Sequence, residues 1–475
     1  MIGNTEYFES EDFKEILRQY EESVKLGEHI YMDADDLADI ADYYRCNNRK
    51  EEARAAIALA MEYNPEAVGP MLFRAREAIE AKDYETVDSL VEKIEPLDPL
   101  EGIYLRAELL ILRNDIEGAD NMLSDYFKDN VPDDEKTDFV TGVLNLYLDY
   151  NMYLPAFNWV KRCISEQNFA QFKEIMAHIL YGIGNYNDSE KLFNELIDDN
   201  PYFDDYWTGM AKTQYMKEDY SSSLNSSEYA LAINPDNSEG LLTKANALFA
   251  LANYDEALEY YEKYSEKEQD DEYGYFQQAL CLINKDMHND ALPLLQKAVS
   301  VSPVDSEYLV DIYFEMAQVY SKLGDLDKAL WCLNMTDHLK CHHAHFEVMK
   351  GHLYLEHDKE QEAKEKFDEA LKMSKNDKVI QLQIIVSYLD NSYLDYAYKS
   401  FVDFFNNVDD KWDVGYSYMA LCCNDLAKKE EFLHYLKKAC DVNPEEAQSL
   451  LFDIFPEDMD VKDYYDYALK HFKDK

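Results

Sequence analysis

The feature that most constrains this chain is an internal repeat with a period near 34 residues. Small residues recur along the sequence, and the central members are spaced by steps of 34: Ala177, Ala211, Ala245 and Ala279. The other members of this series are Ala41, Ala75, Ala107, Ala317, Gly351 and Ala420. A fixed period of this length indicates stacked supersecondary units, each of which buries its apolar face against its neighbours.

A second series of small residues lies twelve positions after the first, and a large apolar residue follows each member four positions later. Ala257 with Tyr261 and Ala363 with Phe367 are two such pairs. Small residues let two antiparallel helices approach closely, and the large residue one turn further fills the space beside them. Proline closes several units because it cannot continue a helix. The pattern predicts helical hairpins joined by short polar turns, such as residues 251–255.

This pattern resembles the tetratricopeptide repeat (TPR), whose signature over 34 residues is W-x2-L-G-x2-Y, then A-x3-F and a closing proline. Residues 313–333, YFEMAQVYSKLGDLDKALWCL, follow the signature closely, and Trp207 supplies its tryptophan. HEAT and armadillo units are longer, and the T-P-L-H motif of ankyrin repeats is absent. The resemblance implies an all-α, right-handed superhelical solenoid of helix-turn-helix repeats, in which the first helix of each unit lines the concave surface.

The register of the repeats divides the chain into three regions. We expect an N-terminal capping helix within residues 1–33, an array of about twelve TPR units over 34–446, and C-terminal capping helices over 447–475. Three units are degenerate, near residues 136–168, 378–412 and 413–446. Leu144 and Ile385 stand in the first two where the first helix needs a small residue, and Phe432 replaces alanine in the second helix of the third.

The chain is strongly acidic, which excludes one large class of partners. Its 97 Asp and Glu against 46 Lys and Arg give a net charge of −51. Such a field repels a phosphate backbone, so we expect no nucleic-acid partner. No apolar run approaches the length of a membrane span, and the N-terminus shows no secretory signal. Eight cysteines without a CxxC motif favour a reducing compartment. We therefore expect a cytoplasmic protein that does not contact a membrane.

Motifs of catalytic and cofactor sites are absent from the sequence. G-x-x-x-x-G-K-[ST], G-x-S-x-G and H-E-x-x-H do not occur, so we predict no enzymatic activity and no cofactor. A His-rich segment, residues 338–357, contains His345 and His352, which lie seven positions apart and would share a helix face. We predict no metal site, and these two histidines are the residues that would ligate a metal ion if the segment bound one. Two other interpretations stay open, a solvated turn that is rich in histidine by chance, and a response to pH near 6.

The resemblance to TPR proteins places partner contacts on the first helix of each unit. In the first third of the chain these positions are acidic, as at Asp42, Glu101 and Glu108, and Leu355 and Leu382 are among the later apolar ones. The candidate groove residues are Tyr181, Lys212, Tyr215, Asn246, Phe249, Tyr273, Phe276, Phe314 and Gln318. Any one of them could instead pack against the neighbouring first helix.

Apolar anchors interleaved with polar groups suit an extended or helical peptide, and the acidity favours a basic or amphipathic one. We therefore predict a non-catalytic protein–protein interaction scaffold or adaptor that binds a protein or peptide along the concave face. The alternative function is a peptide-sensing signalling or transcription regulator of the TPR type.

Overall fold

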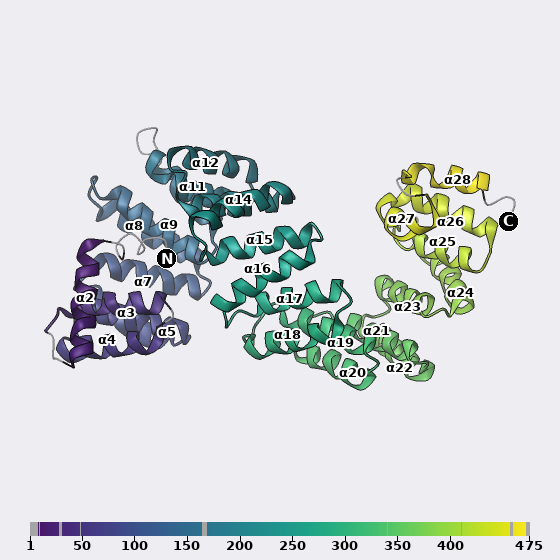
Figure 1. Cartoon of the computed structure of the whole chain (residues 1–475), viewed down its shortest axis with the longest axis horizontal. Coiled ribbons are helices and arrows are strands. Elements are labelled where there is room, and N and C mark those ends of the chain that lie inside the picture. The colour runs from purple at the N-terminus through teal and green to yellow at the C-terminus, as the bar shows by residue number, and fades with distance from the viewer. Residues whose placement is uncertain are drawn as a thin grey trace. The chain divides into compact units, whose positions relative to one another are not determined.

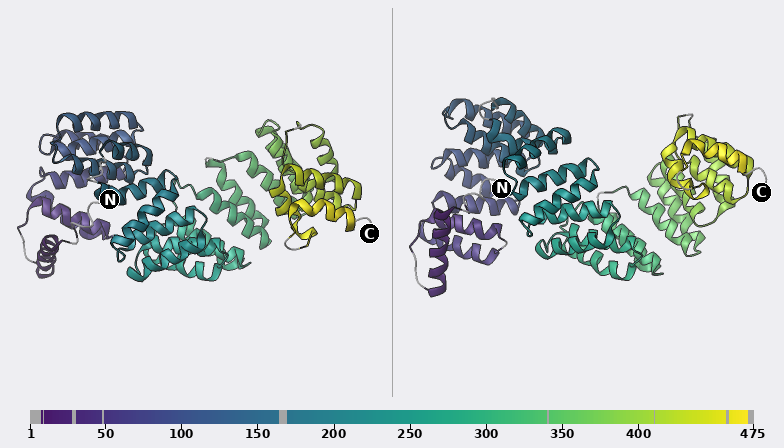
Figure 2. Two further views of the ribbon diagram at one scale, coloured as in Figure 1. Left: turned by 90° about the horizontal axis from the view of Figure 1, so that it is seen from above. Right: turned by 45° about the horizontal axis from the view of Figure 1, so that its top comes forward.

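Pairs of antiparallel helices joined by short turns follow one another along much of the chain in the computed structural model (Figure 1). The structure describes residues 8, 10–27, 31–47, 49–163, 169–339, 341–409, 411–456 and 459–471, and in these ranges the regular secondary structure is helical throughout. The chain divides into two compact units, Met1–Thr243 and Lys244–Lys475. Two further views show the same alternation of helix directions within each unit (Figure 2).

Among the described elements of the first unit, one helix precedes a series of helix pairs. Its helices are α2 (Glu11–Leu26), α3 (Ala34–Cys46), α4 (Lys50–Tyr63), α5 (Val68–Glu80), α6 (Tyr84–Ile94), α7 (Pro99–Leu112), α8 (Ile116–Asp129), α9 (Lys136–Asp149), α10 (Tyr153–Cys163), α11 (Phe169–Gly182), α12 (Tyr186–Asp199), α13 (Asp204–Met216), α14 (Tyr220–Ile233) and the first turns of α15 (Ser238–Ala250).

The second unit continues the same alternation and ends with shorter elements. Its α-helices after α15 are α16 (Tyr254–Lys267), α17 (Glu272–Asn284), α18 (His288–Val301), α19 (Leu309–Lys322), α20 (Leu326–Met335), α21 (His343–Glu356), α22 (Glu360–Met373), α23 (Lys378–Asp390), α24 (Leu394–Phe405), α25 (Tyr416–Asp425), α26 (Lys429–Val442), α27 (Pro444–Leu451) and α28 (Tyr464–His471). Short 3-10 turns are η1 (Thr336–His338), η2 (Phe452–Ile454) and η3 (Val461–Asp463). Within the described residues, α3 to α26 follow one another as twelve helical hairpins.

The two series of small residues form the contacts inside the hairpins, as the sequence predicts. Ala177, Ala211 and Ala279 are fully buried, and the large filler Tyr261 is 1% exposed. The closeness of approach is clearest at Gly351 in α21, where an added Cβ would lie 2.3 Å from the ring of Phe367 in α22. Backbones this close leave no space for a side chain on the first helix.

The turn inside most hairpins contains one residue in the left-handed conformation. Gly184 and Gly324 fill this place with glycine, which adopts a positive φ without steric cost. Elsewhere residues with a Cβ adopt it: Lys82, Asn114, Asn151, Glu218, Ala252, Asp286, Asp358, Ser392 and Ala427. Ala252 adopts this conformation with φ 57°. Its Cβ makes the left-handed conformation sterically unfavourable, and alanine has no polar side chain that could form a compensating local hydrogen bond.

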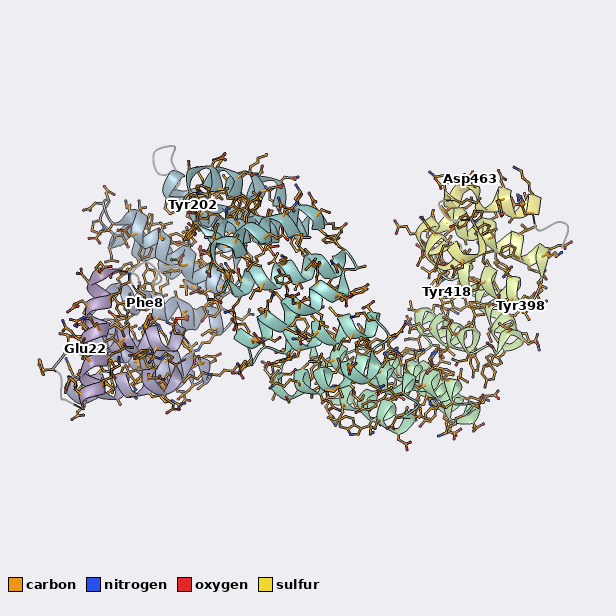
Figure 3. The ribbon with its side chains drawn as sticks, in the orientation of Figure 1. Phe8, Glu22, Tyr202, Tyr398, Tyr418 and Asp463 are labelled. Atoms are coloured by element: carbon orange, nitrogen blue, oxygen red, sulfur yellow. The ribbon has the colours of Figure 1, made fainter. Side chains whose placement is uncertain are left out.

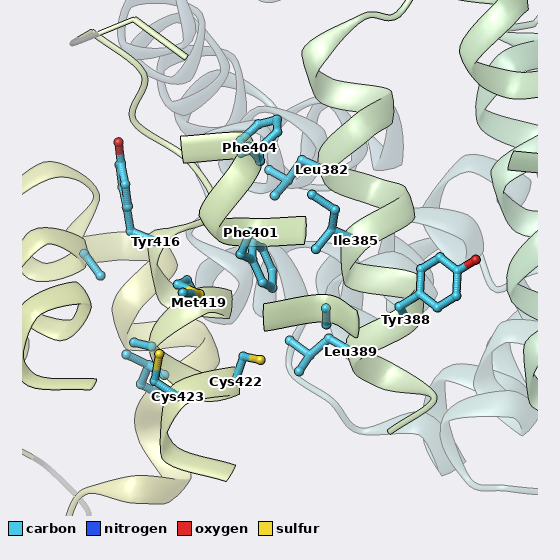
Figure 4. Close-up of a cluster of buried hydrophobic side chains, with 14 of the residues drawn as sticks. Leu382, Ile385, Tyr388, Leu389, Phe401, Phe404, Tyr416, Met419, Cys422 and Cys423 are labelled. Atoms are coloured by element: carbon cyan, nitrogen blue, oxygen red, sulfur yellow. The ribbon is translucent and has the colours of Figure 1, made fainter. Parts of the chain in front are cut away.

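The degenerate units keep their core by burying the larger residues. Leu144 is fully buried in the first unit, and Ile385 and Phe432 are 7% and 2% exposed in the second. Figure 4 shows how the enlarged core is filled around α23 to α25: Phe401 and Phe404 of α24 lie against Ile385 of α23, with Met419 of α25 nearby. These units are therefore packed hairpins in which a larger buried side chain replaces the small residue of the regular units.

The first and last helices cover the ends of the two cores. In α2, Phe13 and Tyr20 are buried, and Gly27 ends the helix in the left-handed conformation. In the second unit, Phe455 stacks on Tyr464 of α28 with ring centroids 4.0 Å apart. Figure 3 draws the side chains as sticks, and they project from the helices of both units. Among the described helices, none combines the length and apolar character that spanning a bilayer requires.

Candidate partner-binding face

Three successive first helices of the first unit bring together a cluster of polar and aromatic side chains. Lys212 of α13 is at its centre, because its Nζ lies 3.2 Å from the Glu239 carboxylate of α15 and 5.8 Å from the centroid of the Tyr181 ring of α11. The cluster, which we call the acidic face, consists of Glu174, His178, Tyr181, Asp205, Lys212, Tyr215 and Glu239.

Carboxylates outnumber cations on the acidic face. Among the described residues, Lys212 pairs with Glu239, whereas Glu174 and Asp205 have no cation within ion-pair distance. The Glu174 carboxylate accepts a hydrogen bond from the Tyr206 hydroxyl at 3.2 Å. Restricted hydration, followed by the neighbouring charges of Asp204, Glu174 and Glu239, raises the pKa of Asp205 to about 6. Burial also raises the pKa of Glu174.

The imidazole of His178 adds no positive charge to this face at neutral pH. Burial lowers the pKa of His178 to about 4, and the ammonium of Lys212 contributes to the shift. The ring packs edge-on against Phe193, with centroids 5.2 Å apart. The acidic face therefore carries three carboxylates against one ammonium, with aromatic rings at its border.

The second unit has its own set of predicted groove residues, centred on Asn246. The Asn246 Oδ1 accepts hydrogen bonds from the hydroxyls of Tyr261 at 2.6 Å and Tyr273 at 3.3 Å. These two bonds fix the orientation of the amide, so its Nδ2 group remains as the donor. Phe249 is half-buried, and its ring lies edge-on to Tyr254 at 5.3 Å.

The exposure of the predicted residues separates them into two groups. Half-buried, with part of the side chain open to solvent, are Tyr181, Lys212, Tyr215, Asn246, Phe249, Tyr273, Phe314 and Gln318. Phe276, Leu355 and Leu382 are only 6%, 2% and 8% exposed. Their side chains belong to the hydrophobic cores of the second unit, so for these three the expectation of a groove position is corrected.

The acidic positions near the N-terminus are partly neutralised. Asp42 pairs with Arg76 on the next first helix and with Arg45, whose guanidinium lies 3.2 Å away. The Glu108 carboxylate accepts a hydrogen bond from the Tyr150 hydroxyl at 2.6 Å. Burial raises the pKa of Glu101 and Glu108, and the positive charge of Arg76 opposes this shift in both. Ion pairs and hydrogen bonds therefore engage the acidic positions Asp42 and Glu108.

The two candidate metal ligands contact different partners. His345 Nδ1 lies 3.0 Å from Gln383 Oε1, whereas His352 Nδ1 lies 3.4 Å from Asn391 Nδ2 and its Nε2 lies 3.7 Å from Glu356. In the ranges that the structure describes, no three His, Cys, Asp or Glu side chains gather in an arrangement suited to a metal ion. The two histidines link α21 to α23 through polar contacts.

The sequence analysis missed Glu174, Asp205 and Glu239. Each lies seven positions before a predicted groove residue, namely Tyr181, Lys212 and Asn246. Two helical turns separate such residues, so both members of each pair share a helix face. Applying this spacing to the predicted set would have found all three carboxylates.

The comparisons with known proteins agree with this architecture. A tetratricopeptide repeat model matches residues 214–280, and a tetratricopeptide repeat-like domain model matches residues 275–391. The chain is a tetratricopeptide repeat protein. Together the two matches span residues 214–391, and no curated protein matches the sequence.

Several solved structures resemble this TPR protein at low sequence identity. Yeast Tom70 is 12% identical, with a TM-score of 0.43 over 93% of this chain and 96% of that chain. The C-terminal part of a TPR repeat-containing protein from Cytophaga hutchinsonii is 15% identical, with a TM-score of 0.39 over 58% and 96% of the two chains. YrrB, described as a TPR protein with an unusual peptide-binding site, is 19% identical, with a TM-score of 0.34 over 40% and 95%.

Proposed function

We propose that this TPR protein is a non-catalytic scaffold that binds a basic or amphipathic peptide segment of a partner protein along its first helices. TPR proteins are protein–protein interaction scaffolds in general, and the finer assignment depends on the chemistry of the acidic face. The observation that carries it is the excess of carboxylates there, where Glu174 and Asp205 have no cationic partner among the described residues. An incoming lysine or arginine would supply the missing charge.

Electrostatic strain within the acidic face supports a cationic ligand. The pKa of Asp205 is raised in part because three neighbouring carboxylates disfavour its ionised form. A bound ammonium or guanidinium would relieve that repulsion and favour the ionised state of Asp205. The rings of Tyr181 and Tyr215 lie on the same face and offer apolar and cation–π contacts to the long side chain of a lysine or arginine.

The predicted groove residues of the second unit would bind the backbone and the apolar side chains of such a peptide. The Asn246 amide is held by two tyrosine hydroxyls, and its Nδ2 group can donate to a peptide carbonyl. Phe249 and Phe314 are half-buried and offer apolar anchor positions. No observation on the described residues favours the alternative of a signalling or transcription regulator.

The experiment measures binding of a fluorescein-labelled lysine–leucine peptide to the full-length protein by fluorescence anisotropy. The test variant is Glu174→Gln/Asp205→Asn, which neutralises the two unpaired carboxylates. The matched control is Asp198→Asn/Glu218→Gln, which removes the same charge at exposed positions outside the face. We expect at least a tenfold weaker affinity for the test variant and a change below twofold for the control.

The pH dependence provides a second check of the same site. Protonation of Asp205 removes negative charge, so the affinity of the wild-type protein should fall as the pH is lowered through about 6. The test variant should lose this step. Equal affinities of test and control variants would show that the peptide responds only to the overall net charge, and the assignment to the acidic face would be wrong.

A further inference from the structure

A cleft outside the groove residues lies in the second unit, where α22, α23 and α24 meet. Its volume is about 520 Å³, within the range of about 300–1,000 Å³ typical of ligand-binding pockets. The apolar part of its lining comes from Leu371, Ile384, Ile385 and Phe404. Ile384, Ile385 and Phe404 are less than 9% exposed, so they form a floor that belongs to the core. Figure 4 shows the Ile385 and Phe404 side chains in the layer between α23 and α24.

This cleft coincides with a break in the repeat. Ile385 occupies the position that a small residue holds in most first helices, so α23 presents a bulky side chain to α24. The preceding turn is also unusual, because Lys375 and Asn376 are both in the left-handed conformation and the proline that closes other units is absent. The irregular turn directly precedes α23 and the bulky Ile385 lies within α23, which forms one wall of the cleft.

The two walls of the cleft differ in hydrogen-bonding chemistry. On α23, Lys378 Nζ donates to Gln381 Oε1 at 3.1 Å and lies 5.6 Å from the centroid of the Phe404 ring. Lys378 forms no ion pair with any residue that the structure describes. An ammonium has three donors, so Lys378 keeps hydrogen-bonding capacity for a ligand.

The opposite wall, on α24, offers acceptors. The Asp403 carboxylate lies at the cleft and has no cation within ion-pair distance among the described residues. Asn407 Nδ2 donates to the backbone carbonyl of Asp403 at 2.7 Å, which leaves the Asn407 Oδ1 as an acceptor. At the rim, the Tyr396 ring lines the cleft and is more than half exposed. The cleft thus combines an apolar floor and rim with one positive and one negative wall.

We propose that this cleft is a second peptide-binding site, separate from the acidic face. Its occupant is a peptide segment with a large apolar residue that enters the floor, an acidic residue on the side that faces Lys378, and a basic residue on the side that faces Asp403. Charge complementarity selects this chemistry, because each wall carries one charge that is not neutralised within the described structure. The opposed walls also fix the direction in which the segment runs.

The experiment selects phage-displayed random peptides against the full-length wild-type protein and measures the affinity of a synthetic consensus peptide by fluorescence anisotropy. We expect a large apolar residue with an acid on one side and a base on the other. Lys378→Glu should weaken binding at least tenfold, and a peptide with its acid replaced by lysine should recover most of the loss. The control Lys372→Glu reverses an exposed charge that does not line the cleft, and it should change affinity less than twofold.

A second variant separates this site from the proposed function. Glu174→Gln/Asp205→Asn alters only the acidic face, so it should leave the affinity of the consensus peptide unchanged. Loss of that affinity in this variant would show that the peptide binds the acidic face, and the cleft assignment would be wrong. Equal effects of Lys378→Glu and Lys372→Glu, or a selection that yields no peptide sensitive to Lys378→Glu, would also overturn it.

Discussion

The Gly351→Ala substitution tests whether close helix approach is the basis of the hairpin core. The added Cβ would lie 2.3, 2.6 and 2.9 Å from three ring atoms of Phe367, whereas comfortable carbon–carbon contacts are about 3.5–4.0 Å. The ring is only 3% exposed and packs against Tyr388 with centroids 5.2 Å apart, so it has little room to move. Overpacking of this kind costs about 1–3 kcal/mol.

Helix propensity acts in the opposite direction, because alanine is favoured over glycine by about 1 kcal/mol inside a helix. The close contact with three ring atoms places the overpacking in the upper part of its range, so we expect a net destabilisation of about 1–2 kcal/mol. The change in the free energy of unfolding is measured by urea denaturation monitored by circular dichroism. Gly240→Ala in α15 is the matched control, since its new Cβ meets no atom closer than 3.3 Å and should be nearly neutral.

A double-mutant cycle tests whether contact with the Phe367 ring causes the destabilisation by Gly351→Ala. Phe367→Leu removes the ring, so the double variant Gly351→Ala/Phe367→Leu should be more stable than the sum of the two single effects by about 0.5–3 kcal/mol. If Gly351→Ala is as stable as the wild type, or if the two substitutions are additive, then steric contact with Phe367 is not what requires a glycine at this position.

Three further predictions concern other parts of the fold. Because the pKa of His178 is lowered to about 4, the unfolded chain binds a proton that the folded one does not, and the free energy of unfolding should fall as the pH is lowered from 6.5 to 4. Urea titrations at stepped pH should show a flatter profile for His178→Leu. Lys350 is 3% exposed and pairs with Glu347 at 2.8 Å and Asp337 at 3.2 Å. Glu347 keeps Lys366 as a second partner at 3.1 Å, so Lys350→Met should destabilise by about 1–3 kcal/mol in urea unfolding. The same change at exposed Lys364 should be nearly neutral. Ala252→Gly should stabilise by about 0.5–1 kcal/mol in thermal unfolding, because it removes the left-handed strain at this alanine; no gain would show that the turn is unstrained.

The hairpin core could be predicted from the sequence because it depends on local spacing. A small residue and its large filler recur at fixed intervals, and residues such as Ala211 and Tyr261 are buried where the register places them. The inner face was predicted only in part, because burial there depends on the neighbouring hairpin. Phe276 occupies a first-helix position like that of Phe314, yet Phe276 is buried in the core and Phe314 is half-buried.

Contacts between hairpins are the part that sequence spacing does not determine. Lys212 and Glu239 form an ion pair across two first helices. Their separation of 27 residues is the 34-residue period less two helical turns, which places both on the same face but does not show that the two side chains meet. The cleft at α22 to α24 is a similar case. Ile385 marks an irregular unit in the sequence, but the cleft beside it is formed by side chains of three helices, whose packing the repeat register does not determine.

The left-handed turns have a consequence for the order in which the hairpins open. In an array of repeats each unit contacts mainly its neighbours, so a change in one turn alters the local opening free energy of that hairpin before it alters the whole chain. Hairpins that turn through Gly184 or Gly324 carry no steric penalty there, whereas the one that turns through Ala427 does. Amide hydrogen exchange should therefore be slower in hairpins with a glycine turn, other contacts being equal, and substitution of turn residues offers a way to set which segment of the array opens first.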